Sequence, residues 1–278
     1  MEHTAMKANA ITTCYVGPEI SPEQFIPEHF FLYLAKGKIE GYDGHRKYVM
    51  KAGDYVLACK NQLARYNKHT DKGAFEKVVV VFDQAFLKGY MERYKIVPPA
   101  PSPKAPFIPL QKNELVPHFI QSLTPYYNNE NNRIGDPFLN VKREELLMIL
   151  LQHNSELAGI LFDFREPEKL DLEAYMNRNY KFNVHLERFA YLTGRSLSVF
   201  KRDFAAIFSD TPNRWLTQRR LQEAYFLLDK KGAKPSEIYL DLGFENLSHF
   251  SFAFKKKYGI APTELSDRKK QALPLKKA

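Results

Sequence analysis

Two short stretches in the last third of the chain combine basic and hydrogen-bonding side chains with a regular spacing of large apolar ones. In both, large apolar residues recur at i, i+4 and i+8, first at positions 200, 204 and 208 and then at positions 250, 254 and 258. This spacing predicts a helix with one apolar face, so the intervening side chains form its outward face. Arginine and lysine on such a face can hold phosphate or donate to guanine, and short polar side chains can bond to other bases. These side chains, with the arginine of the preceding turn, are Arg195, Ser198, Lys201 and Arg202 in the first stretch and Asn246, Leu247, His249, Ser251, Phe252, Lys255 and Lys256 in the second.

The two stretches belong to a longer pattern that occurs twice at an offset of fifty residues. Each copy has a short apolar segment, a tight turn at 193–196 or 243–246, and then the helix described above. Such a pattern predicts a helix-turn-helix, in which the first helix supports a second helix that enters a DNA major groove. Between the copies, Thr211-Pro212 predicts the start of a linking helix of about 17 residues that Gly232 ends. Two motifs on one chain predict contacts with two adjacent major grooves.

The net positive charge of the chain lies almost wholly in the part that carries the repeat. Residues 171–278 hold 20 Lys and Arg against 12 Asp and Glu, whereas residues 1–170 hold 21 against 20. A neutral half joined to a basic half is typical of a nucleic-acid binder with an added sensing or assembly domain. The alternative is a solubilising tail, because four of the lysines lie at positions 269, 270, 276 and 277.

The first half of the chain has the pattern of short strands followed by helices. Apolar runs at 30–34, 48–50, 55–58 and 75–82 alternate with turns that contain Gly, Asp and Lys, which predicts a small barrel or jelly roll. The sequence also predicts a helix over 86–94, an extended proline-rich loop over 97–109, and helices over 115–127 and 137–161.

Residues 141–151 are apolar on more than one face of the last of these helices. One face can pack on the barrel, and the remaining leucines favour pairing with a second copy of the chain across a two-fold axis. The alternative is a helix that is fully buried in the core of one chain. The candidate dimerisation residues are Leu146, Leu147, Leu150 and Leu151.

The repeat resembles the DNA-binding domain of the AraC/XylS family of transcriptional regulators. The similar residues are Arg220-Leu221-x-x-Ala224-x-x-Leu227-Leu228, then Gly243-Phe244-x-x-x-Ser248-x-Phe250-x-x-x-Phe254-Lys255-Lys256-x-x-Gly259-x-x-Pro262, and in the first copy Ser196-x-x-x-Phe200-x-Arg202-x-Phe204. The similarity covers about 100 residues, from Leu170 to Ser266. It implies double-stranded DNA and RNA polymerase as partners. By layout more than by motif, the first half resembles the cupin-like sensing and dimerisation half of such regulators.

We therefore predict a multidomain α+β chain with a cupin-like small β-barrel carrying helices and an all-α domain carrying two helix-turn-helix motifs joined by a linking helix. The predicted boundaries are 1–162 for the regulatory and dimerisation domain, 163–170 for a charged linker, 171–270 for the helix-turn-helix domain and 271–278 for a basic tail.

Five positions depart from the family pattern. Ser209 stands where the first copy usually has a turn glycine, and Tyr239 replaces a small residue of the second supporting helix. Leu265-Ser266 replaces an aromatic-arginine ending. Phe252 occupies a position that often holds arginine, so the second motif is expected to contact the DNA backbone or a thymine methyl group.

The outward residues divide into base-contacting and phosphate-contacting candidates. Arg202 is the best candidate for two hydrogen bonds to guanine, although it could instead pair with an acid of the protein. Lys201 suits guanine or phosphate, and Arg195 suits phosphate. In the second copy, Asn246 could cap the helix instead of contacting a base, and His249 could be an ordinary surface residue. Lys255, Lys256 and Lys257 suit either phosphate contacts or plain solvation.

For the first half we predict no catalytic residue, no metal and no cofactor. His29, His45 and His69 are isolated, whereas metal-dependent barrels gather histidines and a carboxylate, often in a His-x-His pattern. Two alternatives stay open: the barrel binds a small effector beside Tyr33, Tyr48 and Tyr55, or it is controlled by a protein partner or simply dimerises. The same tyrosines could belong to an ordinary core.

The cellular compartment follows from three features of composition. Only Cys14 and Cys59 are present, no apolar run approaches a membrane span, and residues 1–7 lack the layout of a signal peptide. We expect a protein of the reducing cytoplasm with no membrane contact.

Overall fold

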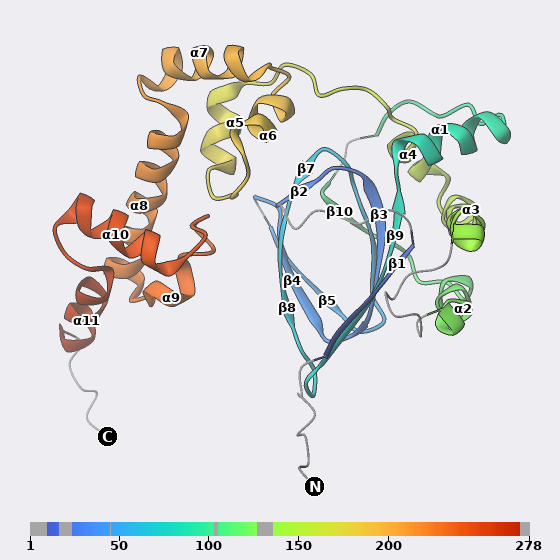
Figure 1. Cartoon of the computed structure of the whole chain (residues 1–278), viewed down its shortest axis with the longest axis horizontal. Coiled ribbons are helices and arrows are strands. Elements are labelled where there is room, and N and C mark those ends of the chain that lie inside the picture. Colours follow the sequence, from blue (N-terminus) through green and yellow to red (C-terminus); the bar gives the residue numbers. More distant parts are fainter. Residues whose placement is uncertain (1–9, 17–23, 45, 103–104, 127–135, 273–278) are drawn as a thin grey trace, which may run out of the picture. The chain divides into compact units, whose positions relative to one another are not determined.

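The computed structural model describes residues 10–16, 24–44, 46–102, 105–126 and 136–272 (Figure 1). The chain divides into two compact units, residues 1–166 and 167–278, and each is described by itself. The division falls inside the predicted linker at 163–170. Of the predicted basic tail, residues 271 and 272 belong to the last helix, and residues 273–278 lie outside the described part.

The first unit is built on two main sheets. The larger has the strand order β1-β9-β3-β6-β10, with β1 and β9 parallel, and the smaller has the order β5-β4-β8. A further two-stranded sheet pairs β2 with β7. The strands are β1 Ala10–Val16, β2 Phe25–Ile26, β3 His29–Lys36, β4 Lys38–Tyr42, β5 Lys47–Lys51, β6 Tyr55–Ala58, β7 Gln62–Leu63, β8 Arg65–His69, β9 Ala74–Phe82 and β10 Phe107–Pro109. Strands β3, β5, β6 and β9 confirm the four predicted apolar runs, whereas the likeness to cupins stays a prediction.

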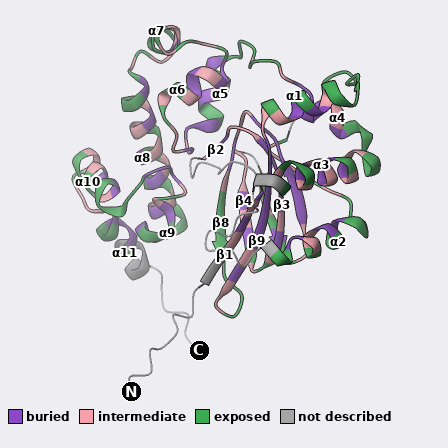
Figure 2. Ribbon diagram, turned by 45° about the vertical axis from the view of Figure 1, so that its right-hand side comes forward, coloured by how far each residue is buried: buried purple, intermediate pink, exposed green. Residues whose placement is uncertain are grey.

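Strand β9 shows why the larger sheet is apolar on both sides. Phe75, Val79 and Val81 belong to the core between the two main sheets, and the alternate Val78 and Val80 belong to a second core on the other face. Successive side chains of a strand point to opposite faces, so a continuous valine run needs cover on both. Figure 2 shows the buried strands between the smaller sheet and the helices.

Helices supply the cover on the second face (Figure 1). The predicted helix over 137–161 is broken at Asn154, because its side chain accepts a hydrogen bond of 3.0 Å from the backbone of Glu156 and starts a new turn. The helical segments are α1 Gln84–Arg93, α2 Leu115–Ser122, η1 Thr124–Tyr126, α3 Asp136–His153, η2 Ser155–Leu157 and α4 Ala158–Leu161.

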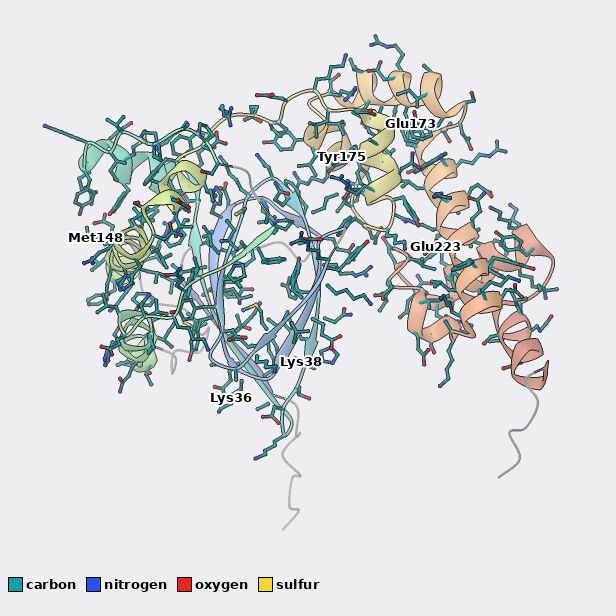
Figure 3. All side chains as sticks on the ribbon, turned by 180° about the vertical axis from the view of Figure 1, so that it is seen from behind. Lys36, Lys38, Met148, Glu173, Tyr175 and Glu223 are labelled. Carbon is teal, nitrogen blue, oxygen red and sulfur yellow. The ribbon has the colours of Figure 1, made fainter. Side chains whose placement is uncertain are left out.

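The leucines of α3 are core residues. Leu146, Leu147 and Leu150 are buried in the cluster that includes Val78 and Val80 of the same chain, and Leu151 is half-buried against it. The prediction that these leucines face a second copy is therefore wrong for Leu146, Leu147 and Leu150, because the sheet, α2 and the turn after α3 use more than one face of the helix. The exposed apolar residues of α3 are instead Phe138, Val141 and Met148, the last labelled in Figure 3.

The second unit is helical, and α8 joins its two halves. Trp215 in the first half of α8 packs on Phe204 and Phe208, with ring centroids 5.6 and 4.6 Å away. Tyr225 in the second half packs on Phe254 and Tyr258, at 6.4 and 4.8 Å. The helices are α5 Leu172–Asn179, α6 Leu186–Leu192, α7 Leu197–Phe208, α8 Pro212–Lys231, α9 Pro235–Ile238, α10 Leu247–Tyr258 and α11 Pro262–Ala272.

The linking helix begins and ends as its sequence predicts. Pro212 is its first residue, after Thr211, although the Thr211 side chain makes no capping hydrogen bond. Gly232 ends it in the left-handed conformation, with φ of 63°. The helix has 20 residues, about 30 Å at 1.5 Å per residue.

Arg220 fastens two other chain segments to the middle of α8. Its guanidinium donates hydrogen bonds of 2.8 Å each to the carbonyl oxygens of Tyr180, Phe182 and Gly243. Burial lowers the pKa of Arg220 to about 10, so the group stays charged at neutral pH. One side chain therefore connects the segment after α5, the linking helix and the turn before α10.

Arg220→Ala is expected to lower the free energy of unfolding of the second unit by about 2–4 kcal/mol, because carbonyl groups that now accept from a cation lose their donor. Trp215 is the only tryptophan of the chain, so its fluorescence during urea unfolding follows this unit. Arg214→Ala is the matched control, since Arg214 lies on the same helix with its side chain largely exposed. A stability loss as small as that of the control would contradict the structural role of Arg220.

Candidate nucleic-acid interface

The two tight turns fix where the second helix of each motif begins. Gly194 and Gly243 have φ of 64° and 85°, and a Cβ atom at either would lie within 3 Å of neighbouring backbone, so the turns favour glycine. Ser196 then accepts from the backbone of Val199 at 3.4 Å, and Asn246 accepts from the backbone of His249 at 2.8 Å. Each helix thus starts at a capped residue directly after its turn.

The ends of these helices also match. Ser209 and Gly259 follow α7 and α10 in the left-handed conformation, with φ of 51° and 75°. Serine is strained there by roughly 1 kcal/mol, so the sequence departure at Ser209 changes the cost of the turn and not its shape. Leu265 is buried in the core of the second motif, and Ser266 donates to the carbonyl of Ala233 at 3.0 Å, which explains how the altered ending packs.

Helix α7 has the outward face that the sequence predicts. Phe200 and Phe204 are fully buried, whereas Ser198, Lys201 and Arg202 are exposed. The Ser198 hydroxyl lies 3.1 Å from that of the capping Ser196. The exposed face therefore begins with two hydroxyl groups and continues with two cations.

Arg195 is not part of this exposed face. Its side chain is only 7% exposed, and Nε pairs with the Asp203 carboxylate at 3.1 Å. Nη1 donates to the carbonyl oxygens of Leu170 and Thr193 at 3.0 and 2.7 Å. The prediction that Arg195 holds phosphate is wrong, because Asp203 and the turn itself use its donors.

Arg202 shares the Asp203 carboxylate from the outside. Its Nε and Nη2 donate to Oδ1 at 3.2 and 3.0 Å, yet the side chain is 74% exposed. Hydrogen bonds from Arg202 and then Arg195 hold the pKa of Asp203 below its usual value. An exposed pair of this kind contributes little to stability, so Arg202 is able to exchange it for another contact. Asp203 is a positioning residue that sequence reasoning missed; its place one residue after Arg202 and eight after Arg195 was the available signal.

Helix α10 presents a different surface. Asn246 serves as the cap, Leu247 and His249 are exposed, and Ser251 is half-buried. Phe252 is 70% exposed, which is unusual for a large aromatic side chain. The start and middle of this helix are thus more apolar than those of α7.

The lysines at the end of α10 fall into two groups. Lys255 and Lys256 are exposed. Lys257 instead donates to the backbone carbonyl of Gln218 at 3.1 Å and lies over the ring of Tyr258. Lys257 therefore fastens α10 to α8, and only the other two lysines are open to a phosphate backbone.

The first unit contains a pocket of about 450 Å³ between strands β5, β6 and β10. Two of the three candidate tyrosines, Tyr48 and Tyr55, line it, and Tyr33 does not. Tyr33 stacks on Tyr55 at 6.3 Å on the helix-covered side, and the Tyr55 hydroxyl donates to the Gln111 carbonyl and accepts from the Asn113 amide. No atom of the described residues bonds to the buried hydroxyl of Tyr48, and burial raises its pKa. The sequence missed most of the lining, which also includes Arg46, Lys47, Met50, Val56, Phe107 and Lys112.

Histidines and cysteines do not gather in the described part of the chain. No group of three or more potential metal ligands occurs among the described residues. His29 is buried, His69 lies 3.5 Å from Glu40, and His45 lies outside the described residues. Cys14 and Cys59 are buried free thiols, and burial raises the pKa of Cys14 to about 12. Within the same described ranges, no helix has the length and apolar character needed to cross a bilayer.

Both units match known protein families. Residues 29–160 match the family described as the ExsA N-terminal regulatory domain, and residues 189–268 match a helix-turn-helix domain family. The virulence regulon transcriptional activator VirF of Yersinia enterocolitica is 29% identical over 44% of this chain and 46% of its own length, so the chain matches less than half of that relative. The transcriptional regulator ExsA of Pseudomonas aeruginosa is 22% identical over 91% of both chains. Among solved structures, ToxT of Vibrio cholerae is 14% identical with a TM-score of 0.41, over 88% of this chain and 90% of that one.

In its two matched domains and their order, a regulatory domain before a helix-turn-helix domain, the chain is similar to the AraC/XylS family of transcription regulators. The relatives are themselves transcriptional regulators.

Arg195→Ala and Arg202→Ala should affect different properties of the protein, the first its stability and the second its DNA affinity. We expect Arg195→Ala to lower the free energy of unfolding by about 1–3 kcal/mol, because Asp203 and two carbonyl groups lose a donor. Arg202→Ala should change stability by less than about 0.5 kcal/mol, yet weaken binding to a duplex selected from a random pool by roughly 1–3 kcal/mol.

Lys255→Ala is the matched control for the base contact. A phosphate contact is independent of sequence, so this variant should weaken binding to the selected duplex and to a scrambled one equally. If Arg202→Ala also weakens both equally, Arg202 contacts the backbone and not a base.

Proposed function

We propose that this protein binds double-stranded DNA through the outward faces of α7 and α10 and thereby regulates transcription. The observation that supports this most is that α7 and α10 both begin at a capped residue and both pack on α8. Each has an exposed outer face, which is cationic on α7 and partly apolar on α10. The excess of basic residues after position 170 supplies the attraction for the phosphate backbone. Such a protein works by binding and not by catalysis, and we expect it to work in the cytoplasm, where the duplex lies.

The two helices are expected to divide the work of recognition. Ser198, Lys201 and Arg202 on α7 suit hydrogen bonds to base edges and phosphates. Leu247 and Phe252 on α10 suit contact with thymine methyl groups, while Lys255 and Lys256 suit phosphate. We infer that the α7 half-site contains guanine and that the α10 half-site is rich in A·T pairs.

The first unit has two alternative modes of regulation. A small effector could occupy the pocket beside Tyr48, or a protein partner could bind the unit from outside. The match to the ExsA regulatory domain supports a regulatory role without deciding between them. We expect RNA polymerase to be the further partner, with activation as the mode, because VirF is named a transcriptional activator.

A homodimer through α3 is the proposed assembly. The exposed side chains of Phe138, Val141 and Met148 form the apolar surface that the buried leucines do not. Pairing of this surface across a two-fold axis would join four helix-turn-helix motifs, which suits two repeated half-sites.

DNA binding should weaken steeply as salt rises. Contacts to several phosphates release counterions, so the logarithm of the binding constant is expected to fall linearly with the logarithm of salt concentration. Fluorescence anisotropy of labelled duplexes with the full chain measures this slope. Salt-insensitive binding, or no binding to any duplex from a random pool, would rule out the proposed function.

Val141→Glu should give a folded monomer, because Val141 is exposed on α3 and a charge there opposes pairing. Leu147→Glu should instead unfold the first unit, since Leu147 is buried in its core. Sedimentation gives the mass and circular dichroism the folded state. A wild-type chain that sediments as a monomer at micromolar concentration would refute the dimer.

A further inference from the structure

Two lysines, one from each of the two main sheets, place their side chains at the same end of the barrel interior. Lys77 lies two residues from both Phe75 and Val79 on β9, and these two side chains lie in the core between the sheets, so the Lys77 side chain points to the same face. Lys68 of β8 pairs in register with the buried Ile39, and its ammonium lies 5.9 Å from the centre of the buried Phe75 ring. Both lysines lie close to one ring, that of Tyr66, at 5.9 and 5.7 Å.

The two lysines differ in depth. Lys77 is only 6% exposed, and its ammonium lies between the rings of Tyr15 and Tyr66, at 5.8 and 5.7 Å. Lys68 and Tyr66 are exposed at the rim. The arrangement is therefore open to solvent past Lys68, with Lys77 at its inner end.

Lys77 has aromatic neighbours and a second cation but no counter-ion among the described residues. Burial first, and then the charge of Lys68, lower the pKa of Lys77 to about 8, so the ammonium form still dominates at neutral pH. The faces of tyrosine rings offset part of the cost of burying a cation, but a carboxylate or phosphate would offset far more.

The acids of the neighbouring strands do not supply that charge. Glu76, next to Lys77 in the chain, points to the other face of β9 and pairs with Lys36 at 2.6 Å. Glu40 pairs with Lys38 at 2.5 Å and lies 3.5 Å from His69. Lys36 and Lys38, labelled in Figure 3, thus have partners of opposite charge at this end of the barrel.

Gly41 connects this site to the pocket already described. Tyr66 and Tyr48 pair with Gly41 from its two sides, and the Tyr48 ring lies so close to the Gly41 Cα that a Cβ atom there would be 1.9 Å from it. Tyr48 lines the pocket of about 450 Å³. One strand, β4, therefore separates Tyr66 and Lys68 of β8 from the pocket beside Tyr48.

We propose that Lys77 and Lys68 bind the oxyanion of a small organic acid or phosphate ester, whose apolar body lies against Tyr15 and Tyr66. The two ammonium groups supply charge-assisted hydrogen bonds, and the tyrosine rings supply an apolar surface. The ligand converts an uncompensated buried cation into an ion pair, so it stabilises the folded first unit. Only the consequence for transcription depends on the proposed function of the whole chain.

Calorimetric titration of the full chain tests the site with three probes of similar shape. Phenylacetate carries a carboxylate, phenyl phosphate carries a phosphate, and phenylacetamide is neutral. We expect one or both anions to bind at physiological ionic strength and the amide not to bind, and the stronger anion identifies the oxyanion preferred. Binding must also raise the melting temperature of the protein.

Three variants assign the binding to these lysines. Lys77→Met should weaken anion binding by about tenfold or more, since it removes the buried partner, and Lys68→Met should weaken it less. Lys38→Met is the matched control and should leave affinity unchanged, because Lys38 already pairs with Glu40. Lys77→Met should fold at least as stably as the wild type without ligand.

Several results would overturn the site. Absence of binding by both anions, or equal binding of the amide, excludes an anion site. Unchanged affinity in Lys77→Met assigns the binding elsewhere, for instance to the basic second unit. If Lys77→Met does not fold, Lys68→Met decides, because Lys68 is exposed, and unchanged affinity there overturns the proposal. DNA affinity measured on the same wild-type sample separates the two questions: DNA binding without anion binding rejects only this site, and the converse rejects only the proposed function.

Discussion

The packing of aromatic side chains on the two halves of α8 is the interaction on which the DNA-binding unit depends. Phe204 and Phe208 contact Trp215 near the start of α8, and Phe254 and Tyr258 contact Tyr225 in its second half. Because these rings hold α7 and α10 by their inner faces, the outer faces of both helices are left for a ligand. Arg220 adds directional bonds at the centre of the same helix, where a purely apolar contact would allow sliding.

The same division between an inner and an outer face explains the different burial of two arginines that bond to one carboxylate. Arg195 and Arg202 both bond to Asp203, but Arg195 approaches from the turn side and is buried, whereas Arg202 approaches from solvent. One carboxylate thus orders the turn on one side and restrains an exposed cation on the other. A cation that is held in place but still exposed loses less conformational entropy when it meets DNA.

In the first unit, alternation along the strands places different chemistry in two separate layers. One face of the larger sheet packs on helices and is largely apolar, and the other faces a barrel interior that is apolar in part and cationic at one end. A buried polar group that lacks a protein partner is costly, and such groups accumulate where a ligand binds. Tyr48 and Lys77 are groups of this kind among the described residues.

The sequence by itself determined the helix-turn-helix repeat, the linking helix, four of the strands and the outward positions on α7 and α10. These follow from spacing, capping and turn residues, which act within a few positions along the chain. The tertiary structure decided the roles of Arg195, of the α3 leucines and of Lys77, since each depends on a partner distant in the sequence. Arg195 meets Leu170 and Asp203, Leu147 meets a sheet that covers it, and Lys77 meets Tyr15 from another strand. Periodicity assigns a side chain to a face of its own element, but only the folded chain determines what covers that face.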